Sequence, residues 1–148
     1  MASILLVAHA PLSASLQAVA RHVYPDCSSE LAALDIPASL GLEEAQRRIE
    51  AALAAMPAGE VLIMADVFGA TPCNAALNVA DGVRVRVVAG ASVPMLWRAL
   101  CYAALPLADL VVRAVDGGRQ GVMQIAAPRR QNQANRPPSD DPDSNPDQ

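Results

Sequence analysis

The chain has 148 residues, of which 53% are hydrophobic but only 3% aromatic, and its formal net charge is -4 at pH 7. This length allows one domain with a sizeable core and is too short for two. The negative charge and the scattered arginines argue against a nucleic-acid partner. The most apolar stretch is broken by prolines and charges, which argues against insertion into a membrane.

Apolar runs alternate with helical patterns in the first half of the chain. Residues 3–8 predict a strand, and residues 30–36 are a weaker strand candidate. Residues 42–56 give the clearest helix, because Glu–Arg pairs four residues apart lie opposite an apolar side and Pro57 follows. The first strand is followed by one face of a helix at the spacing i, i+3, i+4, i+7, formed by Leu16, Val19, Ala20 and Val23.

The alternation continues in the second half. Val61–Ala65 predicts a strand, and a helix begins at the Thr-Pro pair that follows, with Thr71 as its N-cap and Pro72 as its first residue. Residues 83–89 alternate valine with arginine, which predicts a strand near the edge of a sheet with one solvated face.

The last predicted elements complete an α/β pattern. A helix over residues 95–103 precedes a fifth strand over residues 110–115, and Gly117 and Gly118 lead into a short last helix. Strands separated by helices predict a single doubly wound, mainly parallel sheet with helices on both faces. We expect the strand order 2-1-3-4, with the fifth strand at an edge.

Composition separates a domain from a tail. From Pro128 onward the chain consists of Pro, Asp, Asn, Gln and Arg with no large apolar residue. We therefore expect one domain over residues 1–127 and a disordered polar tail over residues 128–148. The three cysteines lack CxxC spacing and no signal peptide is visible, which predicts a cytoplasmic protein with reduced thiols.

Two predicted strands end on residues that can do chemistry, His9 and Asp66. Since the carboxyl ends of parallel strands meet at one edge of a sheet, we expect these side chains to be neighbours. Imidazole, with an unperturbed pKa of about 6.5, can attack phosphorus or carbon through one ring nitrogen if the other keeps its proton. A carboxylate that accepts a hydrogen bond from the second nitrogen fixes this tautomer. The sequence thus predicts His9 as a nucleophile that Asp66 orients.

The loop after Asp66 predicts a site for negative charge. The amides of Gly69, Ala70 and the helical turn that begins at Thr71 would face the crevice as hydrogen-bond donors for an anion. The sequence carries neither a Walker loop nor a GxGxxG fingerprint, and its histidines and cysteines lack metal-ligand spacing. We therefore expect no cofactor and no metal.

Each of these residues also has a plainer interpretation. A lone histidine after a strand is more often a loop or capping residue than a nucleophile. Asp66 could cap a turn, and the Gly-Ala-Thr-Pro stretch could be an ordinary loop that leads into a helix. On spacing alone, both interpretations stay open.

Four stretches together resemble a known family. They are His9 after the first strand and residues 66–76 (DVFGATPCNAA), 88–96 (VAGASVPML) and 118–122 (GRQGV). Over residues 2–126 the sequence resembles the IIA domain of the mannose family of the bacterial phosphoenolpyruvate-dependent sugar phosphotransferase system. The two longer blocks are the more specific part of this resemblance.

The resemblance implies a phosphotransferase that works through a phosphohistidine. The family histidine that matches His9 accepts a phosphoryl group from the carrier protein HPr and passes it to a IIB component. Asp66 matches the orienting aspartate, and Thr71 matches the hydroxyl of the phosphate loop. The resemblance further implies a homodimer, in which a fifth strand matching residues 110–115 is often exchanged between subunits. Sugar transport and regulation by phosphorylation state are both compatible with it.

The chain departs from the family pattern, and other functions compete. The family commonly has glycine after the histidine, where this chain has Ala10 and Pro11, and often tryptophan where this chain has Phe68. A regulatory module that binds partners without being phosphorylated therefore stays open. The start also resembles a small metallochelatase, which needs a second histidine in the distal half, whereas the other histidine here is His22. The phosphotransfer subunit of dihydroxyacetone kinase shares the fold but matches residues 66–76 less well.

Overall fold

The computed structural model describes residues 1–28 and 30–128, so the predicted polar tail lies almost entirely outside the described residues. Among the described helices, none is long and apolar enough to cross a lipid bilayer. Strands and helices alternate in the order β1 (Ser3–His9), α1 (Leu12–Val23), β2 (Leu31–Ile36), α2 (Leu42–Ala55), β3 (Val61–Ala65), α3 (Thr71–Val79), β4 (Val85–Val88), α4 (Val93–Cys101) and α5 (Leu107–Gln120).

These strands form one parallel sheet in the order β2-β1-β3-β4, as the sequence predicts. In the register of the two central pairs, Val7 lies opposite both Leu34 and Ala65. β1 and β3 are continuous apolar runs because both of their faces are covered, and in β1 only His9 is exposed. β4 lies at an edge, as its alternating valines and arginines predict, but it is shorter than predicted.

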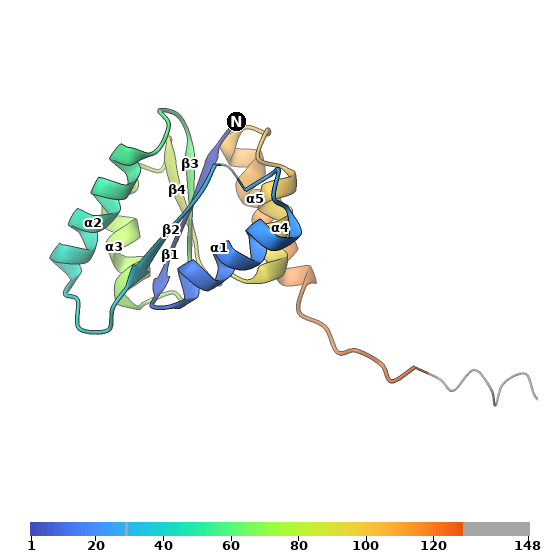
Figure 1. Ribbon diagram of the computed structural model, residues 1–148. Coiled ribbons are helices and arrows are strands. Elements are labelled where there is room, and N and C mark those ends of the chain that lie inside the picture. The colour runs from blue at the N-terminus through green and yellow to red at the C-terminus, as the bar shows by residue number, and fades with distance from the viewer. Residues whose placement is uncertain (29, 129–148) are drawn as a thin grey trace, which may run out of the picture.

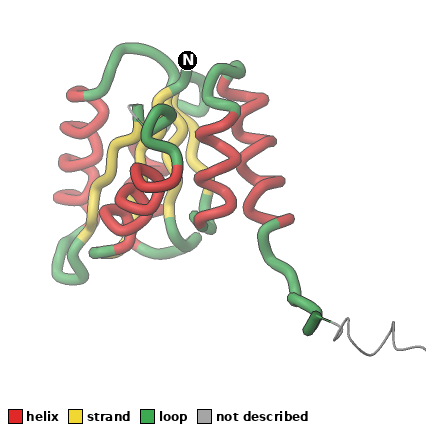
Figure 2. The backbone as a smooth tube through the Cα atoms, turned by 45° about the vertical axis from the view of Figure 1, so that its right-hand side comes forward, coloured by secondary structure: helices red, strands yellow, loops and turns green. Residues whose placement is uncertain are grey.

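Helices cover both faces of the sheet (Figure 1). One face carries α2 and α3, and the other carries α1, α4 and α5, an arrangement that Figure 2 shows from a second direction. Side chains of β1 alternate between the two cores: Ile4 and Leu6 pack under α1, α4 and α5, whereas Leu5 and Val7 pack under α2 and α3. Fully buried alanines such as Ala45 let the helices lie close to the sheet, which explains an apolar composition with few aromatic residues.

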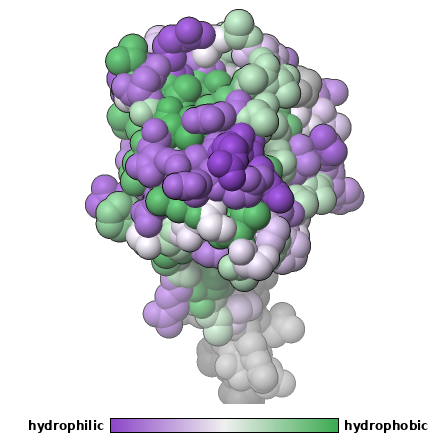
Figure 3. Space-filling view, turned by 90° about the vertical axis from the view of Figure 1, so that its left-hand side faces the viewer, coloured by the Kyte–Doolittle hydropathy of each residue, from purple (hydrophilic) through white to green (hydrophobic). Residues whose placement is uncertain are grey.

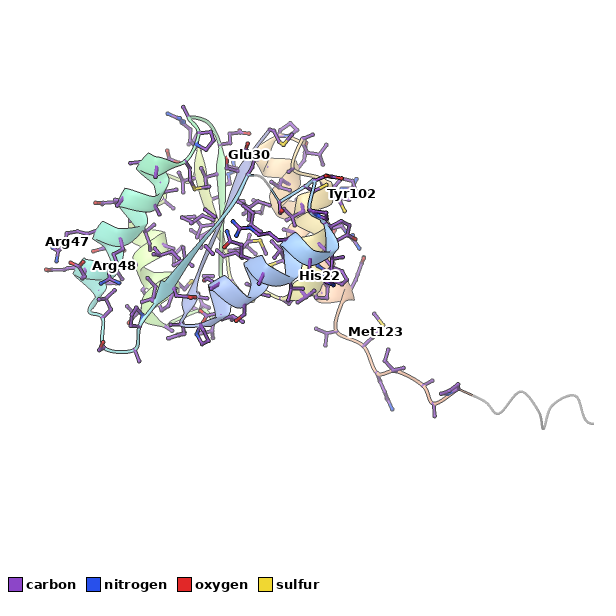
Figure 4. All side chains as sticks on the ribbon, viewed as in Figure 1. His22, Glu30, Arg47, Arg48, Tyr102 and Met123 are labelled. Carbon is purple, nitrogen blue, oxygen red and sulfur yellow. The ribbon has the colours of Figure 1, made fainter. Side chains whose placement is uncertain are left out.

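The outer surface of α2 is hydrophilic (Figure 3). An Arg47 guanidinium nitrogen lies 2.7 Å from a Glu44 carboxylate oxygen, and Arg48, which Figure 4 labels beside it, pairs with the same glutamate. On the opposite side of the helix, Ile49 is fully buried. This division confirms the helix predicted from the Glu–Arg pairs, which ends at Ala55.

The predicted fifth strand is wrong. Residues 110–115 lie inside α5, and the short helix predicted after Gly117 is only the last turn of α5. The valines in this segment favour a strand locally. However, α5 buries residues at helical intervals and packs them against α4 and the sheet, so tertiary packing selects the helix. These buried residues are Leu107, Leu110, Ala114 and Gly117.

Candidate functional site

The carboxyl ends of the strands lie along one edge of the sheet, away from the N-terminus of the chain (Figure 1). His9 is the last residue of β1, and Asp66 directly follows β3. Because Val7 and Ala65 are partners in the β1–β3 ladder, Asp66 lies within one residue of the level of His9. The two residues that the sequence places at strand ends therefore become neighbours.

His9 and Asp66 are joined by two hydrogen bonds. Nδ1 of the imidazole lies 2.7 Å from Oδ2 of Asp66, and the backbone N–H of His9 donates to the same oxygen at 3.0 Å. The other carboxylate oxygen, Oδ1, accepts from the backbone N–H of Val67 at 2.9 Å. The Asp66 side chain is 12% exposed and that of His9 is 45% exposed. The carboxylate is thus held in place while the ring can be reached from solvent.

The charge on Asp66 sets the tautomer of His9. Burial acts to raise the pKa of Asp66, but the hydrogen bonds from the His9 backbone, the His9 ring and Val67 together outweigh burial and hold that pKa below its ordinary value. Asp66 is therefore ionised at neutral pH and can only accept hydrogen bonds. In the neutral imidazole the proton then resides on Nδ1, and the lone pair of Nε2 is free.

The loop after Asp66 leads into the first turn of α3. The N-cap residue of this helix makes no side-chain hydrogen bond to that turn. Gly69 has a φ of +90°, in the left-handed region that favours glycine. Ala70 has extended backbone angles and is the N-cap residue. The predicted N-cap role of Thr71 is therefore wrong by one residue, because the helix already begins at Thr71 and includes Pro72 as its second residue. The structure thus places Gly69, Ala70 and Thr71 in the turn that follows the His–Asp pair.

Main-chain contacts with the segment after β4 fix the backbone of Asp66. The amide of Gly90 donates to the Asp66 carbonyl at 3.0 Å, and the amide of Ala91 donates to the Ala65 carbonyl at 2.9 Å. Both bonds extend the β3–β4 ladder beyond the ends of the strands. The backbone that carries the carboxylate is therefore held by the sheet as well as by His9.

Exposed apolar side chains lie at the same edge. Val67 and Phe68, which follow Asp66, are 50% and 77% exposed, and Leu12 at the start of α1 is 37% exposed. We call these three residues the apolar rim. Large apolar side chains exposed beside a reactive group are typical of a surface that another protein covers.

One contact near the His–Asp pair could not be predicted from the sequence. α1 begins after Pro11 without a side-chain cap from its own N-cap residue. Instead, Oδ1 of Asp35, on β2, accepts hydrogen bonds from the amides of Ser13 at 2.9 Å and Ala14 at 3.3 Å. Local capping signals look only a few residues along the chain, and this carboxylate comes from 22 residues away.

His22 does not join the site, whereas Cys73 lies beside it in the first turn of α3. His22, labelled in Figure 4, lies near the C-terminal end of α1. Across residues 1–28 and 30–128, no group of three or more His, Cys, Asp or Glu side chains is arranged to hold a metal ion. Burial raises the pKa of the Cys73 thiol, which therefore stays protonated at neutral pH. The site is a His–Asp pair beside the first turn of a helix.

Comparisons with known proteins agree with this description. A family model described as the fructose IIA component of the phosphotransferase system (PTS) matches residues 3–116. None of the curated proteins is similar enough in sequence to count as a relative.

Several solved structures have a similar fold. The mannose/sorbose-specific IIA subunit of the phosphotransferase system from Enterococcus faecalis superposes with a TM-score of 0.79 at 24% identity, over 86% of this chain and 97% of that chain. Component EIIA from Streptococcus agalactiae gives 0.75 at 17% identity, over 84% and 97%. A PTS IIA protein associated with the fucose utilization operon of Streptococcus pneumoniae gives 0.67 at 18% identity, over 84% and 96%.

Proposed function

The chain belongs to the family of PTS fructose IIA components, whose model spans residues 3–116, and from this premise we propose that it is a histidine phosphocarrier. A role in the phosphotransferase system follows from the family itself. In the proposed mechanism His9 accepts a phosphoryl group from phospho-HPr and passes it to a IIB component or holds it as a regulatory signal. The observation that carries this assignment is the 2.7 Å contact between Nδ1 of the exposed His9 and the ionised Asp66.

The proposed step needs no proton transfer at the attacking atom. The lone pair of Nε2 on His9 forms a bond to phosphorus while the bond from phosphorus to the donor breaks, and the electron pair of that bond returns to the donor. The ring gains positive charge, which Asp66 stabilises through the Nδ1 proton. Transfer to the acceptor repeats the same exchange in the opposite sense.

The first turn of α3 supplies the second requirement, stabilisation of the phosphoryl oxygens. We assign the amides of Gly69 and Ala70 and the hydroxyl and amide of Thr71 to this role. A helix N-terminus favours negative charge because its first amides lack partners within the helix. Positioned donors can hold the phosphoryl group without activating water, so transfer depends on geometry between two docked proteins.

We further propose that the chain forms a homodimer. After α5 the segment of residues 121–128 projects from the body of the molecule, where Figure 4 labels Met123. Its large apolar side chains Val122, Met123 and Ile125 are 84%, 64% and 77% exposed. β4, at the edge of the sheet, pairs with β3 on one side. An exposed apolar segment and an edge strand are both surfaces that a second copy could cover.

The experiment that tests the phosphocarrier is intact-mass analysis at mildly basic pH after incubation with phosphoenolpyruvate, Enzyme I and HPr. We expect one added, acid-labile phosphoryl group on the native protein and on His22→Ala, the matched control that removes the other histidine. The His9→Ala variant should gain none. A His9→Ala variant that still takes up a phosphoryl group would contradict the assignment, as would an unmodified native protein beside an active control IIA.

A second variant tests the orienting role. Asp66→Ala removes the acceptor of the Nδ1 proton, so we expect the rate of phosphoryl transfer to His9 to fall by about 100-fold or more. The measurement is a rapid-quench time course with phospho-HPr. Transfer at the native rate would remove Asp66 from the mechanism.

A further inference from the structure

Four helices begin at the edge that carries His9, and two of them, α1 after β1 and α3 after β3, differ in their first turns. The first turn of α3 follows Ala70, which offers no side-chain cap. The first turn of α1 is closed by the carboxylate of Asp35, which accepts from the amides of Ser13 and Ala14. The N-terminus of α1 therefore carries a negative charge from a neighbouring strand, whereas that of α3 offers its amides to a ligand.

Asp35 lies close to the reacting histidine through the sheet. It is the β2 partner of Ala8, and the next ladder position pairs His9 with Ile36. The amide of Ala10 then donates to the Ile36 carbonyl at 3.1 Å, which continues the pairing past the end of β1. Neighbouring strands are about 4.8 Å apart. The Asp35 carboxylate is thus placed beside the short connection that runs from His9 into α1.

We propose that Asp35 is a positioning residue, which closes the N-terminus of α1 to anions so that the phosphoryl group on His9 is held at α3. This inference rests on the proposed phosphocarrier function. Without Asp35, the free amides of Ser13 and Ala14 would form a second positive helix end, four residues along the chain from His9. Its carboxylate also repels the phosphoryl dianion, which keeps the group easier to pass on.

The first test does not depend on phosphorylation and uses inorganic phosphate as the probe. Phosphate is titrated into the ¹⁵N-labelled native protein and into Asp35→Ala, and the amide resonances of Ser13 and Ala14 are followed. We expect saturable shifts of both resonances in the variant and none in the native protein. Saturable shifts in the native protein, or their absence in the folded variant, would overturn the proposal.

The second test measures the equilibrium of phosphoryl exchange with HPr. Opening a helix N-terminus to an anion should raise the equilibrium constant for phosphorylation of Asp35→Ala by about two- to tenfold. It should also move the ³¹P resonance of the phosphohistidine. Asp35→Asn keeps an oxygen acceptor for the amides and loses the charge, so it should raise the equilibrium constant less than Asp35→Ala. Because it keeps this acceptor, Asp35→Asn should remain folded even if the alanine variant does not. A constant unchanged in Asp35→Asn would contradict the proposal.

A matched control separates this role from capping in general. Oδ1 of Asp81 accepts from the amides of Val83, Arg84 and Val85 before β4, at the end of the sheet away from His9. Asp81→Asn should therefore leave the exchange equilibrium and the ³¹P resonance unchanged. If Asp81→Asn and Asp35→Asn shift both to the same extent, Asp35 acts only as a structural cap. A native protein that accepts no phosphoryl group would instead refute the phosphocarrier function, and the phosphate titration would still decide the role of Asp35.

Discussion

His9 and Asp66 are buried to different extents, and the difference suits their proposed roles. The carboxylate is 12% exposed and accepts three hydrogen bonds, whereas the imidazole is 45% exposed and open to a second protein. The contact between His9 and Asp66 could be predicted, because each follows or ends an apolar run that is typical of a buried parallel strand. The bond from the His9 backbone to Asp66 could not, since it depends on how the two chains leave their strands.

The pH dependence of stability should report the charge on Asp66. Because its pKa is lowered in the folded protein, ionised Asp66 stabilises the fold above the unfolded pKa of about 3.9, and this contribution is lost as the pH falls through the folded pKa. Asp66→Asn should therefore be less stable than the native protein by about 1–2 kcal/mol at pH 7. Urea denaturation from pH 7 down to pH 2 measures this difference, which should disappear at the acid end. A difference that stays constant with pH would mean that folding does not change the pKa of Asp66.

Phe68 of the apolar rim should serve docking and contribute little to folding. Its side chain is 77% exposed, so Phe68→Ala should change the free energy of unfolding by less than about 0.5 kcal/mol. We expect KM for phospho-HPr to rise severalfold with little change in kcat, measured by steady-state phosphoryl transfer. Val112→Ala, which truncates another exposed side chain (58%) on α5, is the control and should leave KM unchanged. Equal KM values for both variants would exclude Phe68 from the docking surface.

The described helices differ in how their first turns are satisfied, and among them only α4 is capped by the side chain of its own N-cap residue. In α4, Oγ of Ser92 accepts from the amide of Met95 at 3.3 Å, as capping rules anticipate. α1 depends on Asp35, and the first turn of α5 depends on Glu60, whose Oε2 accepts from the amide of Leu107 at 3.1 Å. Capping rules consider only residues within a few positions of the helix start. The caps that Asp35 and Glu60 supply from distant parts of the chain could therefore not be predicted from the sequence.

The contact between α4 and α5 leads to a prediction about two adjacent glycines. A Cβ added at Gly117 would lie 2.5 Å from Cβ of Arg98 and 3.3 Å from the Pro94 carbonyl oxygen. One added at Gly118 would meet mainly the flexible end of Met95, at 2.8 Å from Cε. Gly117→Ala should therefore destabilise the protein by about 1–3 kcal/mol. Gly118→Ala should be neutral or stabilising by up to about 1 kcal/mol, because alanine favours the helix.

Thermal unfolding of both variants checks this comparison. The sign of the difference matters more than its size, since both changes raise helix propensity equally and only the neighbouring atoms differ. Equal midpoints for the two variants would show that α4 can move away from α5 without loss of packing.

At the scale of the whole molecule, the apolar segment after α5 is one surface of the described residues that the single chain leaves uncovered. Two changes on it, Val122→Asp and Ile125→Asp, place charges on side chains that are 84% and 77% exposed, so they should leave the fold of one chain intact. If this segment joins two copies, the native protein should have twice the chain mass of 15.4 kDa in sedimentation equilibrium, and the double variant should have the chain mass.

A control keeps this prediction specific. Leu77→Asp charges an exposed apolar residue of α3, which is 46% exposed, and should leave the dimer unchanged. A native protein with the mass of a single chain would contradict the proposed homodimer. A double variant that stays dimeric would place the interface elsewhere.

The sequence by itself determined the parallel strand order β2-β1-β3-β4 and the meeting of His9 with Asp66. Both follow from patterns that are local, because apolar runs of five or six residues mark buried strands and parallel strands bring their carboxyl ends to one edge. Only the tertiary structure decided that residues 110–115 are helical, that Ala70 rather than Thr71 is the N-cap of α3, and that Asp35 closes α1. These outcomes depend on packing against α4 and on contacts between residues distant in the chain. Neither can be predicted from the local sequence.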